Sequence, residues 1–484
     1  MKKKVYITFL DVTKAYDKAW LDAILYVLYK EGIDSPEWMV IKKLNEGLTA
    51  TIQTKYGETR EIKITDSIRQ GGVLSVIEYA TLMDEISKKI KENNLGIYIP
   101  SIEEKIGCLL WMDDVILIST EIPEHQIMLN ITDNVAGTYH VEFGDDKSKS
   151  MVQGLRKNLP KFTIGEMTLG NCNKYKYLGA IKNNQNNMKD HISAVKSKVE
   201  GAYQTILAIT GNRDLADIEM ECIWKLIECT IIPIITYACE TWDLNKKEEN
   251  EMNSILDNII KRILMMPQKG TTRESLYIET GLLDPATIQH KQRLMMNHRM
   301  MYSNNERLKK LATSNTESLW KNLVKTSCDK LKITPEELRD EKYAVKNNVK
   351  KKAQEYMKLK TESEGQEKSK VQHLIKGKIE WTPGKRAKYL DKLTRKECNT
   401  IFRARTRMSE VKNNFKTKYQ DNTCRACKTT TETQEHVLNE CQILHPTSES
   451  KVTSQDIFNE DTESLRNTAK KIKETLEKIN KNPD

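Results

Sequence analysis

Three aspartates near the start of the chain have the types and spacing that chemistry with divalent metal ions requires. Asp11 ends a strand-like alternating segment, residues 5–11, and Asp113 and Asp114 stand side by side in the apolar run 108–119. Adjacent buried carboxylates are costly unless cations or hydrogen bonds compensate them. Two Mg²⁺ ions about 3.5–4 Å apart need carboxylates from more than one strand end. We therefore predict that Asp11 and Asp113 bind two Mg²⁺ ions, with Asp114 as the adjacent acid.

Each acidic feature also has an ordinary structural interpretation when it is taken alone. Asp is favoured in turns, so Asp113 and Asp114 could simply close a hairpin. Asp11 could instead face the dipole at the N-terminus of the following helix. The order of the surrounding motifs, described below, favours metal binding.

A second set of candidate metal ligands lies near the C-terminus. The pattern Cys424-x₂-Cys427-x₈-His436-x₄-Cys441 supplies three thiolates and one imidazole, a complete tetrahedral set for structural Zn²⁺. Four protein ligands leave no open position, so catalysis by this zinc is not expected. His445 is a second choice for the imidazole, and free thiols are the alternative. The other seven cysteines are scattered singly, too sparsely for a disulfide framework.

The hydrophobic pattern predicts the elements that position these residues. A mixture of strands and helices extends to about residue 181, and nearly everything after it has a helical pattern. The best helix is expected at 252–264, where apolar residues recur at i, i+3, i+4 and i+7. Strands are expected at 5–11, 49–54 and 61–65, a hairpin at 108–119, and further helices at 14–31, 76–92 and 461–478.

Charge is distributed unevenly along the 484 residues. Net charge is +10, but residues 341–420 hold 23 Lys and Arg against 9 Asp and Glu. Such a block suggests a polyanion partner, most often nucleic acid, and a solvated helical linker is the alternative. Within it, Arg403, Arg405 and Arg407 could contact phosphates or could begin an exposed basic helix. The composition, with 38% hydrophobic residues, excludes a collagen-like or wholly disordered chain.

Five segments together resemble the reverse transcriptase domain of non-LTR (LINE-type) retrotransposons. Their order and spacing agree with that family over about residues 5–181, starting at its motif A. Further on, residues 281–285 (Gly-Leu-Leu-Asp-Pro) resemble its thumb, and 402–407 resemble the segment before its C-terminal zinc knuckle. The five segments are Phe9 to Asp17 (motif A), Arg69 to Ser75 (motif B), Met112-Asp113-Asp114 (motif C), Phe143 to Ser148 (motif D) and Tyr177-Leu178-Gly179 (motif E).

The resemblance implies roles for four further residues. Tyr16 falls where the family places an aromatic gate against the 2′-hydroxyl of a ribonucleotide, although it could be a core aromatic of the first helix. Gln70 and Gly71 would line the template and the nascent base pair. Lys147 would lie near the triphosphate and could protonate pyrophosphate, although a solvated loop lysine is equally consistent with the sequence. Trp111 departs from the family's usual Tyr or Phe.

The fold class expected is an α/β polymerase palm without fingers, followed by an α-helical thumb and a small zinc knuckle. Only ten residues precede Asp11, so we expect the fingers and an upstream endonuclease to be absent. The expected divisions are 1–181 (palm, motifs A to E), 182–310 (thumb), 311–400 (basic helical connector), 401–450 (zinc knuckle) and 451–484 (charged helical tail).

The function implied is RNA-directed DNA polymerisation, a two-metal nucleotidyl transfer onto a DNA primer 3′-end. The partners would be an RNA template, a DNA primer or target, and deoxynucleoside triphosphates. No apolar run approaches the roughly 18 residues of a membrane span, so we expect no membrane partner. The location expected is intracellular, either nuclear at an integration site or cytoplasmic with the element's RNA. The alternatives are an inactive remnant that only binds nucleic acid, and a maturase-like splicing helper, which leaves the knuckle unexplained.

Overall fold

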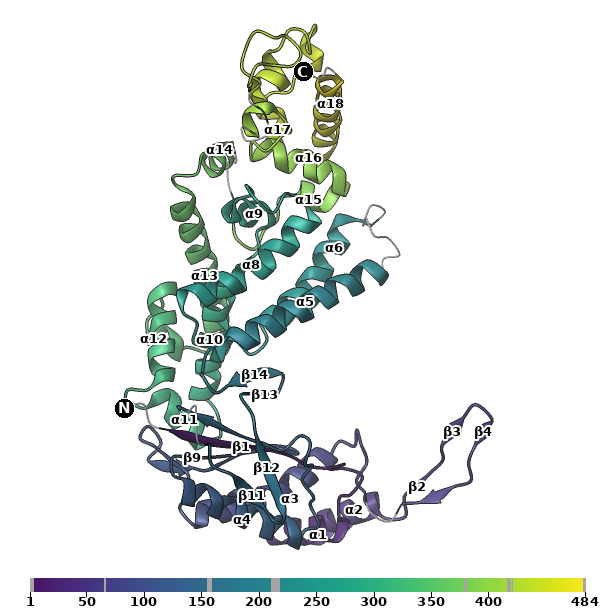
Figure 1. Cartoon of the computed structure of the whole chain (residues 1–484), viewed down its shortest axis with the longest axis vertical. Helices are drawn as coiled ribbons and strands as arrows, with labels where there is room; N and C mark the ends of the chain where they lie inside the picture. Colours follow the sequence, from purple (N-terminus) through teal and green to yellow (C-terminus); the bar gives the residue numbers. More distant parts are fainter. Residues whose placement is uncertain are drawn as a thin grey trace. The chain divides into compact units, whose positions relative to one another are not determined.

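The chain divides into two compact units. The computed structural model describes residues 4–64, 67–154, 159–209, 218–377, 381–415, 419 and 421–481. The first unit comprises residues 1–190 and 314–316, and the second comprises residues 191–313 and 317–484. The first is mixed α/β and the second is helical, which confirms the predicted change of structure at this level (Figure 1).

A six-stranded sheet forms the centre of the first unit. Strand β1 (Val5–Asp11) occupies an interior position and pairs antiparallel with β9 (Asp114–Ser119) on one side and β10 (Lys149–Gln153) on the other. The order is β11-β12-β10-β1-β9-β8. The remaining strands are β8 (Cys108–Trp111), β11 (Phe162–Ile164) and β12 (Met167–Asn171). The predicted strand 5–11 and the predicted hairpin 108–119 are therefore confirmed.

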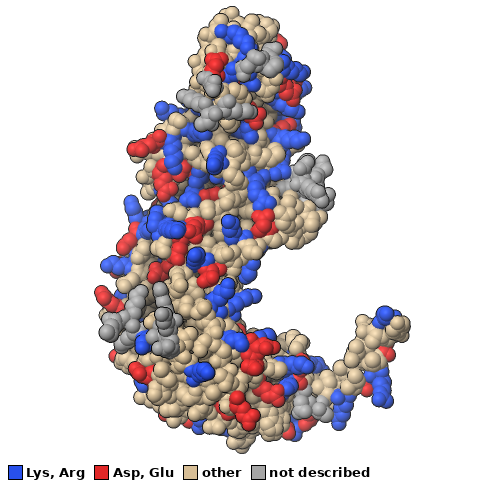
Figure 2. Space-filling view, viewed as in Figure 1, with Lys and Arg blue, Asp and Glu red and all other residues tan. Residues whose placement is uncertain are grey.

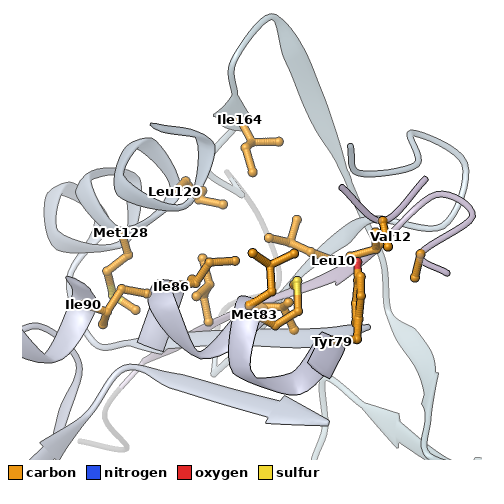
Figure 3. Packing of buried hydrophobic residues seen from close by; sticks show 14 of the residues in the cluster. Leu10, Val12, Tyr79, Met83, Ile86, Ile90, Met128, Leu129 and Ile164 are labelled. Carbon is orange, nitrogen blue, oxygen red and sulfur yellow. The ribbon is translucent and has the colours of Figure 1, made fainter. Parts of the chain in front are cut away.

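Helices cover one face of this sheet. They are α1 (Leu21–Lys30), α3 (Ser75–Glu92) and α4 (Ile122–Thr138). Their apolar stripes bury against the sheet, and this burial is the main favourable contribution to folding of the unit. Figure 3 shows part of this core, with Leu10 and Val12 near Tyr79 and Met83 of α3, and Leu129 on α4.

A separate hairpin packs on the other face. It consists of β13 (Lys174–Tyr177) and β14 (Ala180–Asn183). Its Tyr175 stacks on Phe9 of β1, with ring centroids 4.1 Å apart and ring planes 8° apart. Phe9 also packs with Ile116 and Met151, so this side of the sheet has its own small apolar cluster.

The segment between the first and third helices departs from prediction. The helix expected from residue 14 begins only at Leu21, because residues 12–18 form turns beside the 142–144 loop. The strand expected at 49–54 is divided into β2 (Thr49–Ala50) and β3 (Gln53–Thr54). β3 pairs with β4 (Gly57–Glu58), and β2 pairs with β5 (Ile62–Lys63). Thr65, the expected end of the 61–65 strand, lies outside the described residues. The other elements here are α2 (Ser35–Asn45), β6 (Ile97–Ile99) and β7 (Glu104–Ile106).

The second unit is built from helices. The predicted helix at 252–264 is α8 (Lys246–Ile263), which buries the expected apolar face and begins with a capping box between Asn245 and Glu248. The others are α5 (Lys189–Ile209), α6 (Met220–Leu226), α7 (Ile232–Ile235), α9 (Arg273–Thr280), α10 (Pro285–Met301), α11 (Glu306–Thr313), α12 (Leu319–Leu331), α13 (Lys342–Gly365), α14 (Ser369–Gly377), α15 (Tyr389–Lys392), α16 (Arg395–Arg405), α17 (Ser454–Ile457) and α18 (Thr462–Asn480).

One helical segment of this unit, Met220–Thr241, is long and apolar enough to cross a membrane by length and composition alone. The expectation that no stretch approaches this length was therefore wrong. A buried core helix passes the same test, and Trp224, Ile227, Ile231 and Ile235 are fully buried within the unit. The absence of a membrane partner stays a prediction.

Candidate active site and metal clusters

The strand register places Asp11 directly opposite Asp114. The two residues are Cα partners at the last pair of the β1–β9 ladder, and Asp113 lies in the tight turn that joins β8 to β9. Residues opposite each other across two strands share a face of the sheet. Burial raises the pKa of Asp114, and the charges of Asp113 and Asp11 raise it further. The predicted pairing of Asp11 with Asp113 at the metal site stays a prediction, and the register adds that Asp114 is the Cα partner of Asp11.

The motif D loop supplies a cation to this acidic pair. The Nζ atom of Lys147 lies 3.2 Å from Oδ2 of Asp11. The loop is fixed against β1, because the Gly144 amide donates to the Asp11 carbonyl at 2.9 Å and the Asp11 amide donates to Oγ of Ser148 at 3.3 Å. The Lys147 side chain is 72% exposed, so the ion pair contributes little stability. Its charge opposes part of the rise in the pKa of Asp114 that burial and the neighbouring aspartates cause.

Tyr16 lies close enough to the acidic turn for the charge of Asp113 to act on it. Its half-buried ring stacks on Tyr79 of α3, with centroids 5.5 Å apart. Burial raises the pKa of Tyr16, and the charge of Asp113 adds to the effect. The same two causes raise the pKa of Tyr79. Asp113 therefore acts electrostatically on this tyrosine pair, while Asp114 is opposite Asp11.

The two motif B residues are exposed. Nε2 of Gln70 lies 3.5 Å from Oδ1 of Asp17, a weak contact. Gly71 has φ +83 and no atom within 4 Å of where a Cβ would be, so its conformation rather than crowding favours glycine. Both residues are accessible to a partner.

An open hollow joins the acidic pair to the β13–β14 hairpin. Acidic and basic residues line this hollow together. The sequence analysis did not identify Lys174, Tyr175 and Lys176 as site residues. The sequence feature that could have identified them is the alternation Lys174-Tyr175-Lys176 just before motif E. Burial raises the pKa of Tyr175 to about 12, helped by the charges of Asp11 and Asp114. The lining residues are Asp11, Asp114, Asp146, Lys147, Lys149, Lys174, Tyr175, Lys176, Leu178 and Gly179.

The acidic residues fit Mg²⁺ by their donor chemistry, because carboxylate oxygens are the ligands that hard divalent cations prefer. In this structure, the carboxylate oxygens of Asp11, Asp113 and Asp114 do not all lie close enough together to bind one ion. Among the described residues, the only group of three or more His, Cys, Asp or Glu ligand atoms close enough for one ion is Cys424, Cys427, His436 and Cys441.

The cysteine cluster has the geometry expected of a zinc knuckle. Its four ligand atoms all lie within 4.8 Å of one another. The Cys424 amide donates to the Thr430 carbonyl at 2.7 Å, which folds the first pair into a turn, and the π-helical turn His436–Glu440 presents the other pair. Three sulfurs and one imidazole nitrogen this close together match tetrahedral Zn²⁺. The predicted ligands are therefore brought together.

The thiol of Cys427 is prepared for metal binding. Burial acts to raise its pKa, but hydrogen bonds from Thr429 and Thr430 outweigh that effect and lower the pKa to about 5. The thiolate is the form that binds metal. His445, the second choice for the imidazole, is engaged elsewhere, with Nε2 2.8 Å from the Val437 carbonyl and Nδ1 3.1 Å from Oγ of Ser450.

The three arginines before this cluster are ion-paired with glutamates. Arg403 and Arg405 lie in the last turn of α16 and Arg407 follows its end, so they do not begin an exposed helix. Arg405 is buried and ion-paired with Glu279. Arg403 and Arg407 pair with glutamates at 2.8 Å and 3.1 Å. Their charges are already compensated within the protein.

Comparisons with known proteins identify the class. Residues 1–181 match the family model described as "Reverse transcriptase (RNA-dependent DNA polymerase)". This match assigns residues 1–181, nearly all of the first unit, to a reverse transcriptase domain.

A similar protein indicates the kind of reverse transcriptase. The chain is similar to the "Retrovirus-related Pol polyprotein from type-1 retrotransposable element R2" of Popillia japonica, with 27% identity over 190 residues. The match covers 37% of this chain and 31% of that protein, so the chain spans under a third of the relative's length. The domain is therefore of the non-LTR retrotransposon type.

Two solved structures also align. They are telomerases from Candida albicans and Candida tropicalis, each in complex with a TWJ fragment of telomeric RNA. Identities are 11% and 14%, and the TM-score is 0.30 for both. The alignments cover 72% and 65% of this chain, and 49% and 50% of those chains.

Proposed function

We propose that the first unit is an RNA-directed DNA polymerase that extends a DNA 3′-end on an RNA template. The observation that carries the proposal is the opposition of Asp11 and Asp114, with Asp113 in the adjoining turn, inside a reverse transcriptase domain. Its partners would be RNA template, DNA primer or target and deoxynucleoside triphosphates. It would act inside the cell, in the nucleus at an integration site or in the cytoplasm with the element's RNA.

Asp11 and Asp113, with Asp114 beside them, would hold two Mg²⁺ ions in this proposal. Bound there, the ions would activate the primer 3′-hydroxyl and neutralise charge on the triphosphate. Burial is the main cause of the raised pKa of Asp114, and repulsion from the charges of Asp113 and Asp11 adds to it. This repulsion favours occupation of the site by cations.

The neighbouring residues would bind and orient the reactants. Lys147, already beside Asp11, would contact the triphosphate and donate a proton to the departing pyrophosphate. The ring of Tyr16, supported by Tyr79, would occupy the space that a 2′-hydroxyl needs. Gln70 and Gly71 would contact the template and the nascent base pair.

Primer extension on a polyribonucleotide template tests the proposal. The parent chain should extend the primer only with Mg²⁺, and Asp11→Asn or Asp113→Asn should lower the rate by about 10³-fold or more, because removing a ligand costs several kcal/mol of transition-state stabilisation. Asp22→Asn makes the same chemical change at an exposed position in the first turn of α1 and should leave the rate unchanged.

Extension by Asp113→Asn at the parent rate would refute the assignment. An inactive parent that still binds nucleic acid would identify the chain as a remnant that only binds nucleic acid. Asp114→Asn is the informative third variant, since the register places Asp114 and not Asp113 opposite Asp11.

A further inference from the structure

A row of cations runs along two packed helices of the second unit. Arg299 lies near the end of α10, Arg339 lies just before α13, and Lys342, Lys346 and Lys350 recur every four residues along α13. This spacing places successive lysines on one side of the helix. All five side chains are exposed, and none forms an ion pair with another described residue.

The beginning of the row lines a hollow. Arg299, Arg339 and Lys342 border it together with Tyr302, which is 58% exposed. The hollow also contains Asp340 and Glu341, so cations exceed acids by three to two there. Its other lining residue, His298, is buried, with Nε2 3.1 Å from the Asp340 carbonyl.

The row is crowded with like charge further along. Lys291 of α10 is partly buried where α10 packs against α13. Burial lowers the pKa of Lys291, and the charges of Lys350 and Lys346 lower it further. Like charges held this close are unfavourable until an anion compensates them. The packing of the two helices therefore concentrates positive charge along one line.

Exposed aromatic rings accompany these cations. Tyr343 follows Lys342 directly and is 76% exposed, and Tyr302 lies in the adjoining hollow. Cations that follow a phosphate backbone, combined with aromatic rings on which bases stack, are the combination that binds single-stranded nucleic acid. A duplex offers phosphates but few accessible base faces.

The rest of the basic segment is less available. On the face drawn in Figure 2, Lys and Arg alternate with Asp and Glu, so charge alone does not outline a site. Arg386 and Arg403 are ion-paired, and Lys360 is buried against Asp284. On α13 itself, Lys351 and Lys352 are both engaged with Glu355.

We propose that single-stranded nucleic acid binds along this α10–α13 row, with phosphates on the cations and a base stacked on Tyr343. The proposal goes beyond polymerase chemistry because it requires none of the residues around Asp11. It rests on the proposed function only for the choice of nucleic acid as the polyanion. The row consists of Lys291, Arg299, Arg339, Lys342, Lys346 and Lys350, with Tyr302 and Tyr343.

Fluorescence anisotropy can measure how the chain binds a labelled oligouridylate at a series of salt concentrations. This measurement tests the proposal. Lys346→Gln/Lys350→Gln removes two phosphate contacts and should reduce the slope of log K against log salt by about 1.4. Lys351→Gln/Lys352→Gln is the matched control on the same helix and should retain the parent slope. Each variant should unfold at the same melting temperature as the parent, which verifies that its fold is intact.

The aromatic part of the proposal has its own test. Tyr343→Ala should weaken oligouridylate binding by about fivefold or more, Tyr343→Phe should retain it, and a duplex of the same length should be insensitive to both. Equal effects of the two lysine pairs, parent-like binding by Lys346→Gln/Lys350→Gln, or an unchanged affinity in Tyr343→Ala would overturn the proposal. Asp113→Asn should bind like the parent, so loss of primer extension and loss of this surface are distinguishable.

Discussion

The buried ion pair between Arg405 and Glu279 gives the sharpest quantitative prediction. The side chain of Arg405 is 4% exposed and that of Glu279 is fully buried, with Nη1 3.4 Å from Oε2. Arg405 also donates to the carbonyls of Ile457 at 2.9 Å and Asn459 at 3.1 Å, and its guanidinium lies 4.6 Å from the Tyr389 ring centroid. One side chain therefore connects α9, α16, α17 and the segment after α17.

Arg405→Met leaves the Glu279 carboxylate buried without its partner. Breaking a buried pair in this way costs about 3–5 kcal/mol. At about 2.1 cal/mol/K of unfolding entropy per residue, each kcal/mol shifts the unfolding temperature of a unit of this size by about 1.6 °C, so the melting temperature should fall by about 5 °C or more. Arg407→Met is the matched control, because its pair with Glu435 is exposed and should contribute about 0–1 kcal/mol.

Differential scanning calorimetry measures both variants, and Glu279→Leu/Arg405→Met should recover much of the loss because the uncompensated charge is gone. The phosphate-contact interpretation of Arg405 makes the opposite prediction. A melting temperature that falls no further than in Arg407→Met, accompanied by weaker nucleic-acid binding, would refute the structural reasoning.

Three further outcomes are expected. Tyr16→Ala should admit ribonucleotides while deoxynucleotide use falls less, measured by incorporation of both substrates; unchanged discrimination would make Tyr16 a core aromatic. The purified chain should contain one zinc, which Cys427→Ser or a chelator should remove with a lower unfolding temperature of the second unit; a zinc content near zero under reducing conditions would refute the knuckle. His125 is buried, which lowers its pKa to about 4, so the unfolded chain takes up a proton near pH 6.5 before the folded chain does. Stability should therefore fall between about pH 6.5 and 4 by up to roughly 3 kcal/mol, and His125→Gln should flatten the pH dependence of the unfolding midpoint.

Features set by local sequence were predictable. The strand ending at Asp11, the hairpin around Asp113 and the amphipathic helix α8 follow from periodicity over a few residues. The Cys cluster was also found, because its ligands lie within 18 positions of one another and their spacing is typical of zinc sites.

Features set by distant contacts were not predictable. The turns at 12–18 replace the start of a helix because Val12 bridges Phe143 and the Thr13 amide donates to the Glu142 carbonyl. The role of Arg405 depends on Glu279, which is 126 positions away.

The surroundings of the zinc knuckle also depend on residues distant in the sequence. The π-helical turn His436–Glu440 contacts α18, which lies beyond residue 450. In addition, Arg425 forms a buried pair with Glu432 at 2.7 Å. A fragment used to study the knuckle should therefore extend through α18.

The stack of Tyr175 on Phe9 has a consequence for how the domain can accommodate different substrates. Phe9 and Asp11 are two residues apart on the same interior strand, so the β13–β14 hairpin and the first carboxylate are fixed to one rigid support. In the proposed polymerase, a primer end bound beside this hairpin would share its support with the first carboxylate, so movement of one would be transmitted to the other.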